Sequence, residues 1–328
     1  MYHIQNQMLS IRSVVNISRN REHCGSRGIF EFLHAHGRIL HSENGIYAIE
    51  KPINVLSHPN KSDDCYRSII NAPYNSSKEA FEIRTPQGSL VKNIYLLNRL
   101  DSATSGIIMI STDEAMATMV KELFARRLIS KVYKAIVFCD EKIESNQRSL
   151  IWQDTIEIKK VMGHNRAVQS KPSSRGSLTA LTNITITEPN LHSIGSDNRS
   201  SKNMMMIELR PATGYTHQLR YQCALHSYPI VGDKTYGNFR LNKTFEDASK
   251  QKSKTDGDPK SRGKRNADKD WDSEGTLQSP PIDRKRLYLH SFGIEFRYEC
   301  NSTTFLFKAV SKLPTEFVEI IRNSYDKF

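Results

Sequence analysis

The stretch LLNRLDSATSGIIMIST, residues 96–112, places two charged side chains, Arg99 and Asp101, between two apolar runs. Small polar residues and Gly106 follow the acid, so the backbone can turn sharply and leave space for a ligand. A carboxylate in such a turn, two residues from an arginine, can act as a nucleophile whose charge is held by a cation. Taken alone, the stretch is better explained by a structural Arg–Asp ion pair.

Two further stretches carry side chains that could take part in chemistry. KVYK, residues 131–134, places Tyr133 in the alternating pattern of a half-buried strand, and by itself this tyrosine would be interpreted as a core residue. The other stretch, residues 210–237, follows an apolar run with a dense group of polar side chains: Thr213, Thr216, His217, Gln218 and Arg220.

Together these stretches resemble the RluA-type pseudouridine synthases, enzymes that isomerise uridine to pseudouridine in RNA. The family's HRLDxxTSG block is present as NRLDSATSG at residues 98–106, its K-x-Y block as KVY at 131–133, and its TGRTHQ(I/L)R block as TGYTHQLR at 213–220. Shorter matches are EKPINVLSHP at 50–59, PIVGD at 229–233 and RLYLH at 286–290. The matches keep the family's order from about residue 38 to about 310. The chain departs from the pattern at Asn98 and Tyr215, where the family usually has histidine and arginine or lysine.

Carried over position by position, the resemblance implies that Asp101 is the catalytic carboxylate, which attacks the flipped uridine or its sugar while the base detaches and rotates. Tyr133 would stack on the base and assist proton removal from C5. Arg220 would pair with Asp101, and an ion-paired aspartate stays ionised, as a nucleophile requires. The departures at Asn98 and Tyr215 lie outside this set, so we expect retained activity with altered RNA contacts.

The resemblance also implies a set of substrate-binding residues. Arg99 would fill the gap left by the extruded base, because an arginine can stack there while it neutralises phosphate. Leu219 would form an apolar wall of the pocket, and Thr104 would line it. We expect His217 and Gln218 to supply hydrogen bonds rather than acid–base chemistry, because the isomerisation consumes no water and needs no metal.

Strand-like segments with few helices favour an α+β protein. The resemblance implies the pseudouridine synthase fold, a mainly antiparallel mixed central sheet flanked by helices. Strands are predicted on both sides of the Asn44–Gly45 turn and at 94–97, 106–110, 131–138, 178–187, 204–209, 286–296 and 303–310. Helices are predicted around 77–84, after a capping box formed by Ser111 and Glu114, and at 313–323.

We divide the chain into a basic N-terminal arm at residues 1–30 and a catalytic domain at 31–328. The arm carries arginines at 12, 19 and 21 and no acid before residue 22, so a frayed tail is favoured and an organellar transit peptide is the alternative. A low-complexity insertion at about 241–285 mixes both charges with Gly, Ser and Pro, and has almost nothing to bury, so we expect it to be disordered.

The net charge of +12 favours a polyanionic partner, and the expected one is RNA, either rRNA or tRNA. The five cysteines are odd in number and lack metal-ligand spacing, which fits a reducing compartment. We expect a cytoplasmic protein, with a mitochondrion or another organelle as the alternative. No cofactor, metal or membrane partner is expected, and the protein should be a monomer. His58, His226 and His290 are scattered and are interpreted as structural.

Two other functions remain open from the sequence. One is a catalytically inactive RNA-binding protein of the same fold, encouraged only by the changes at Asn98 and Tyr215. The other is a carboxylate-based glycosidase, which would need a second acid beside Asp101. No such acid is evident near the matching blocks.

Overall fold

Strands dominate the protein in this computed structural model, which describes residues 32–85, 87–140, 149–194, 202–255 and 286–325. The first strands are β1 (Arg38–Glu43), β2 (Ile46–Lys51), β3 (Tyr74–Asn75), β4 (Ala80–Arg84), β5 (Leu90–Leu96) and β6 (Ser105–Ser111). The later strands are β7 (Ser130–Cys139), β8 (Ser149–Val161), β9 (His164–Gln169), β10 (Leu178–Ile194), β11 (Lys202–Pro211), β12 (Leu289–Cys300) and β13 (Thr303–Val310). The helices are η1 (Ser62–Arg67), α3 (Glu114–Ala125), α4 (Gln218–Leu225), α5 (Phe239–Thr255) and α6 (Thr315–Tyr325).

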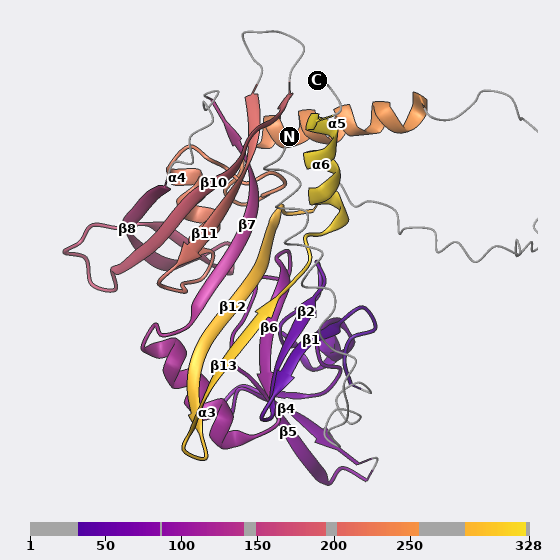
Figure 1. Ribbon diagram of the computed structural model, residues 1–328, viewed down its shortest axis with the longest axis vertical. Coiled ribbons are helices and arrows are strands. Elements are labelled where there is room, and N and C mark those ends of the chain that lie inside the picture. The colour runs from indigo at the N-terminus through magenta and orange to yellow at the C-terminus, as the bar shows by residue number, and fades with distance from the viewer. Residues whose placement is uncertain (1–31, 86, 141–148, 195–201, 256–285, 326–328) are drawn as a thin grey trace, which may run out of the picture. The chain divides into compact units, whose positions relative to one another are not determined.

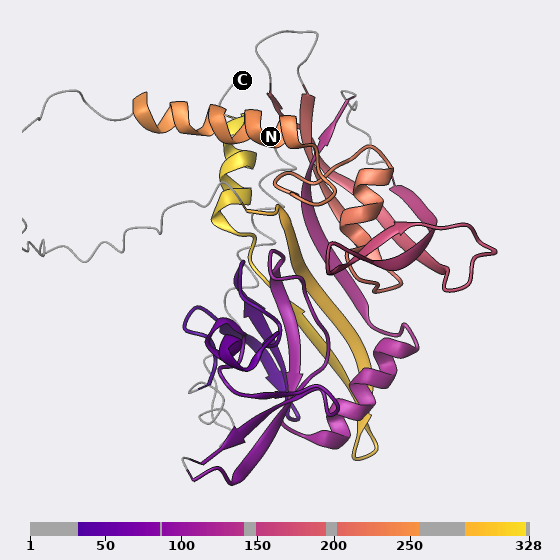
Figure 2. The same cartoon turned by 180° about the vertical axis from the view of Figure 1, so that it is seen from behind.

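The strands form one mixed sheet in the order β3-β4-β5-β6-β12-β7-β11-β10-β8-β9, with β1 and β2 paired beside β6 and β13 beside β12. Among the described strands, β12 and β6 pair in parallel and the other neighbours are antiparallel. Strand β12 therefore joins a half built from β1 to β6 to a half built from β7 to β11, as Figure 1 and the reverse view in Figure 2 show. This confirms the α+β class and the mainly antiparallel mixed sheet.

Each half of the sheet has its own apolar core. In the first, α3 packs Ala117 and Val120 against β2 and β6, as its apolar stripe predicts. In the second, α4 and α6 contribute Cys223 and Phe317 to a cluster with β7 and β11. Long apolar runs such as Ala135–Cys139 in β7 are buried because the sheet is covered on both faces there.

Several predicted boundaries change in the structure. The N-terminal cap of α3 is Asp113, whose carboxylate accepts a hydrogen bond from the Met116 amide (2.8 Å), so the capping box at Ser111 is wrong. The Ser111 hydroxyl instead donates to the Gly45 carbonyl (2.9 Å) and ties β6 to the β1–β2 turn. The helix predicted around 77–84 is also wrong, because residues 80–84 are recruited as β4 between β3 and β5.

The predicted disordered insertion is wrong over residues 241–255, which belong to helix α5. Phe245 explains part of this order, since it is buried against Tyr288 of the second core. Residues 256–285 and the predicted N-terminal arm lie outside the described residues. Within the described parts of the chain, no helix combines the length and apolar character needed to span a bilayer.

Candidate active site

Asp101 lies in the turn between β5 and β6, and this turn is held from below by a buried lysine. The Lys51 amine donates to the carbonyls of Pro52 (2.8 Å), Val55 (2.8 Å) and Ser102 (3.0 Å). The Thr104 amide closes the turn by donating to the Asp101 carbonyl (3.0 Å). These contacts fix the backbone on both sides of the Asp101 side chain, which stays 27% exposed.

Arg220, on the first turn of α4, joins two carboxylates. Its Nε and Nη2 donate to Asp233 Oδ2 (2.8 Å) and Oδ1 (2.9 Å), and its Nη1 donates to Asp101 Oδ2 (3.0 Å). Burial alone would lower the pKa of Arg220, because it disfavours the charged guanidinium. The hydrogen bonds and negative charge of Asp233, with a smaller contribution from Asp101, outweigh burial and raise this pKa. Burial also opposes charge on Asp233, but Arg220 holds the pKa of that carboxyl below its usual value. Arg220 is thus a permanent cation at the side of Asp101.

The geometry leaves one oxygen of Asp101 available. The Arg220 guanidinium and the His217 ring both approach Oδ2, at 3.0 and 3.6 Å. Among the described residues, Oδ1 has no hydrogen bond or ion pair with another side chain. Because Arg220 is anchored on its buried side by Asp233, it can hold Asp101 without covering this second oxygen.

A pocket of about 100 Å³ opens beside Asp101 and brings the sequence-predicted residues together. All eight of them line it: Arg99, Asp101, Thr104, Tyr133, His217, Gln218, Leu219 and Arg220. They come from the β5–β6 turn, from β7 and from the start of α4. Segments up to about 120 residues apart in sequence therefore meet in one hollow, because the sheet places β6, β12 and β7 next to one another.

The apolar side of this pocket is formed by Tyr133, Leu219 and Leu289. Tyr133 lies on β7 opposite Leu209 of β11 and Ser291 of β12. Burial raises the pKa of Tyr133 to about 12, although a hydrogen bond to the Ser291 side chain acts in the opposite direction. The phenol therefore keeps its proton at neutral pH and presents an aromatic ring to a flat ligand.

His217 and Gln218 are placed as hydrogen-bonding groups. The His217 backbone is left-handed (φ 57°), and its Nδ1 lies 3.2 Å from the Tyr236 hydroxyl. Burial, reinforced by Arg220, lowers the pKa of His217 despite the opposing charge of Asp101. Gln218 accepts hydrogen bonds from the Thr213 hydroxyl (2.8 Å) and the Tyr215 amide (3.1 Å), so it shapes the loop that borders the pocket.

Arg99 and Thr104 differ in their exposure. Arg99 is exposed, and the described structure records no hydrogen bond or ion pair for it, so its guanidinium is available to a ligand. Thr104 is buried at the base of the pocket.

Sequence reasoning assigned no role to three charged residues of the site: Lys51, Lys131 and Asp233. The Lys131 amine lines the pocket, donates to the Thr213 carbonyl (3.1 Å), and has its pKa lowered to about 8 by burial. All three residues lie inside blocks that match the family, and this was the signal available. Their partners are backbone carbonyls or, for Asp233, an arginine 13 residues away in another element, which spacing does not reveal.

The two departures from the family pattern have structural roles. The Asn98 Oδ1 accepts a hydrogen bond from the Met109 amide (2.7 Å), which extends the contact between β5 and β6. Tyr215 packs against a small apolar cluster that includes Ile156 and Ala180 of the β8–β10 region. Neither change removes a contact of Asp101 with Arg220.

A buried chain of hydrogen bonds lies behind the Asp101 turn. Arg286 Nη2 donates to Ser105 Oγ (2.6 Å), which lies 2.8 Å from His290 Nδ1. His290 Nε2 lies 3.0 Å from Ser311 Oγ, and Ser311 donates to Glu50 (2.6 Å). Burial, with the charge of Arg286, lowers the pKa of His290 to about 3. Because the Ser311 proton goes to Glu50, neutral His290 carries its proton on Nε2 and accepts from Ser105.

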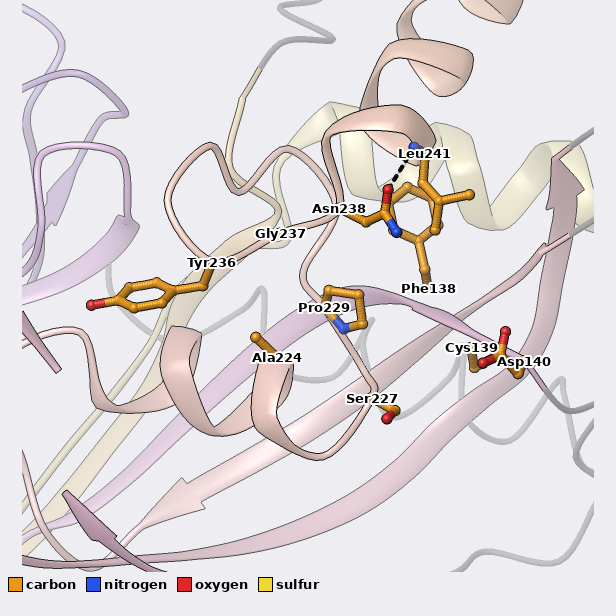
Figure 3. A pocket seen from close by; sticks show the side chains of 10 residues that line it. All are labelled: Phe138, Cys139, Asp140, Ala224, Ser227, Pro229, Tyr236, Gly237, Asn238 and Leu241. Carbon is orange, nitrogen blue, oxygen red and sulfur yellow. Dashed lines mark hydrogen bonds between the residues drawn. The ribbon is translucent and has the colours of Figure 1, made fainter. Parts of the chain in front are cut away.

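A separate pocket of the described structure lacks these groups. A pocket of about 320 Å³ lies between the end of β7 and the end of α4, and shares no lining residue with the pocket of Asp101. In Figure 3, Asn238 turns toward the start of α5, where its side chain accepts a hydrogen bond from the Leu241 amide (3.1 Å). In the part of the chain that is described, no group of three or more His, Cys, Asp or Glu side chains is arranged to hold a metal.

Comparisons with known proteins identify a family. The model of the family described as RNA pseudouridylate synthase matches residues 45–225. "tRNA pseudouridine synthase C" of Vibrio vulnificus is 28% identical over 215 residues, which cover 64% of this chain and 77% of that protein. "Ribosomal large subunit pseudouridine synthase C" of Rickettsia bellii is 25% identical over 205 residues, 62% of this chain and 58% of that protein.

A solved structure supports the fold. "Human RNA Pseudouridylate Synthase Domain Containing 4" aligns over 91% of this chain and 95% of its own, with a TM-score of 0.53 and 19% sequence identity. Because the family model spans more than half of the sequence, this chain belongs to the RNA pseudouridylate synthase family, RluA type, and is an RNA pseudouridine synthase, an isomerase.

Proposed function

We propose that the protein converts specific uridines of tRNA or rRNA to pseudouridine, with Asp101 as the catalytic carboxylate. The observation that carries the proposal is the Arg220 guanidinium, which binds buried Asp233 on one side and Oδ2 of Asp101 on the other, at the mouth of a pocket lined by Tyr133. The printed names of the Vibrio and Rickettsia relatives suggest the two RNA classes.

The reaction balances without any added reactant. The C1′–N1 bond of uridine breaks, the base rotates, a C1′–C5 bond forms, C5 loses a proton and N1 gains one. Asp101 attacks the uridine or its sugar through Oδ1, holds the intermediate while the base turns, and is released as the carboxylate when its bond to the intermediate breaks and the C1′–C5 bond forms. Tyr133 and Leu219 provide the flat apolar surface on which the base can rotate, and Arg220 keeps the carboxylate in place. The phenol of Tyr133, which keeps its own proton at neutral pH, assists transfer of the C5 proton as a hydrogen-bonding group.

Arg99 occupies the place of the extruded base. It is exposed at the rim of the pocket and is not engaged by another described residue. Extruding a base costs about a few kcal/mol, and stacking a guanidinium into the vacancy offsets part of that cost. Thr104, His217 and Gln218 shape the pocket that receives the base.

If the protein were instead a catalytically inactive RNA-binding protein, removing its gene would abolish no pseudouridine in cellular RNA. Pseudouridines should be mapped by a chemical stop assay in total RNA from cells with and without this gene, and after complementation with wild type or with Asp101→Asn. We expect at least one tRNA or rRNA site to disappear and to return only with the wild type. Loss of no site would contradict the proposed function.

A further inference from the structure

A second, larger hollow lies on the other side of Asp101. Its volume is about 680 Å³, against about 100 Å³ for the pocket described above. Both hollows are lined by Asp101, His217 and Arg220, so these three side chains form a shared wall. A uracil base fills only a space of the smaller size, and the larger hollow therefore has room for a neighbouring part of the same polymer.

Within the described structure, some charged groups of this hollow have ion-pair partners and others have none. Its two carboxylates, Asp101 and Asp233, are both bound to Arg220. Arg286 is also engaged, since it donates to Glu316 (2.9 Å) and Ser105. The remaining cations, Arg166 and Lys234, have no ion pair or side-chain hydrogen bond within the described structure. The hollow thus presents uncompensated positive charge a short way from the reacting carboxylate.

The two cations lie on different elements of the fold, and hydrogen bonds hold both elements in place. Arg166 lies on β9, and the next residue, Ala167, donates its amide to the Tyr236 hydroxyl (3.0 Å). Lys234 lies in a tight turn in which Asp233 Oδ1 accepts from the amides of Thr235 (2.8 Å) and Tyr236 (3.0 Å). Tyr236 therefore links the hairpin that carries Arg166 to the turn that carries Lys234.

The positive charge of Arg166 also reaches the shared wall. It contributes to lowering the pKa of His217, together with the larger effects of burial and Arg220. Neutral residues that line the same hollow, including Asn54 and Asn165, offer further hydrogen-bond donors. This combination suits a phosphodiester, which carries one negative charge and several acceptor oxygens.

We propose that this hollow is the subsite for the backbone flanking the target uridine, with Arg166 and Lys234 as its phosphate-binding residues. The inference rests on the proposed function. With the base in the smaller pocket beside Tyr133, the attached ribose lies at Asp101 and the adjoining phosphate enters the larger hollow. The subsite contributes affinity for RNA and reads no base directly.

The test uses the full chain and two double variants of equal charge change. Arg166→Gln with Lys234→Gln removes the proposed phosphate contacts. Lys171→Gln with Arg175→Gln, on the exposed loop after β9, removes two positive charges that line neither hollow. Binding of a fluorescein-labelled oligouridylate strand should be measured by anisotropy over a series of salt concentrations, with thermal unfolding as a check on folding.

We expect the Arg166/Lys234 variant to bind roughly tenfold more weakly, with the slope of log K against log salt reduced by about 0.7 for each lost contact. The control variant should stay within about twofold of the wild type. Equal weakening in both variants would overturn the subsite. Since the assay measures binding without turnover, it stays separate from the proposed function, whose failure would show as a wild type that forms no pseudouridine.

Discussion

At the scale of single residues, the site depends on Arg220, whose two carboxylate partners differ in burial. Arg220 is held twice by Asp233, which is 1% exposed, and once by Asp101, which is 27% exposed. The buried pair keeps its geometry without the substrate, because separating a buried ion pair leaves a costly unpaired charge. Asp101 is therefore the partner that can change its contacts during a reaction.

Lys51 gives a prediction for the dependence of stability on pH. Burial lowers the pKa of Lys51 to about 7 from its usual 10.5, against the opposing effect of Asp101. Between these values the unfolded chain binds more protons at this residue than the folded chain. The contribution of Lys51 to the free energy of unfolding must therefore rise as the pH increases from about 7 to about 10.5.

Urea unfolding of wild type and Lys51→Met at several pH values measures this contribution. The variant should be destabilised at every pH, because the carbonyls of Val55 and Ser102 lose their donor. The gap between the two proteins should widen above pH 7. A gap that is constant or narrows over this range would contradict the lowered pKa.

The proposed catalytic residues illustrate what sequence could and could not predict at this scale. Asp101, Tyr133 and Arg220 stand in recognisable blocks, and the structure brings them to one pocket. Asp233 also stands in a matching block, but its role depends on a fork to Arg220 that only the folded chain shows. Spacing along the chain carries no information about such contacts between side chains of different elements.

At the scale of elements, the site depends on how closely β6 approaches β12. Gly106 has φ +105°, and a Cβ atom there would lie 2.1 Å from the Ser291 carbonyl oxygen. This glycine thus allows the parallel pairing of His290 with Ser105 and of Ser291 with Gly106. The same pairing aligns the hydrogen-bond chain behind the Asp101 turn.

Gly106→Ala should destabilise the protein by about 3 kcal/mol or more, since it combines an unfavourable φ with a backbone clash. Gly176→Ala is a matched control, because Gly176 also has positive φ (+88°) but would meet nothing within 4 Å. The control should cost only about 1 kcal/mol. If denaturant unfolding showed the same loss of stability for both variants, the close approach of β6 and β12 would contribute nothing to stability.

Element predictions succeeded where the apolar pattern matched the final environment. The strand predicted at 303–310 coincides with β13, and the strand at 131–138 lies within β7. The hairpin of β8 and β9 was not predicted. Its turn residues, Met162 and Gly163, both have positive φ in the structure. The segment 80–84 became a strand because β3 and β5 flank it, and local propensity does not contain that information.

At the scale of the whole molecule, the sheet brings the two halves of the site together across β12. The β5–β6 turn supplies the carboxylate from one half, and β7 and α4 supply Tyr133 and Arg220 from the other. The fold class and the order of the motifs could be predicted because the family resemblance covers both halves. The position of the larger hollow could not, since β9 and the Lys234 turn meet only in the folded chain.

The most direct test of the account compares purified wild type with Asp101→Asn on an RNA transcript that contains a target uridine. Asparagine keeps the size and the turn but removes the nucleophilic charge. We predict that the rate of pseudouridine formation falls about a thousandfold or more while RNA affinity stays within about twofold. A variant that still converts uridine at a rate near that of the wild type would contradict the assignment of Asp101 as the catalytic carboxylate.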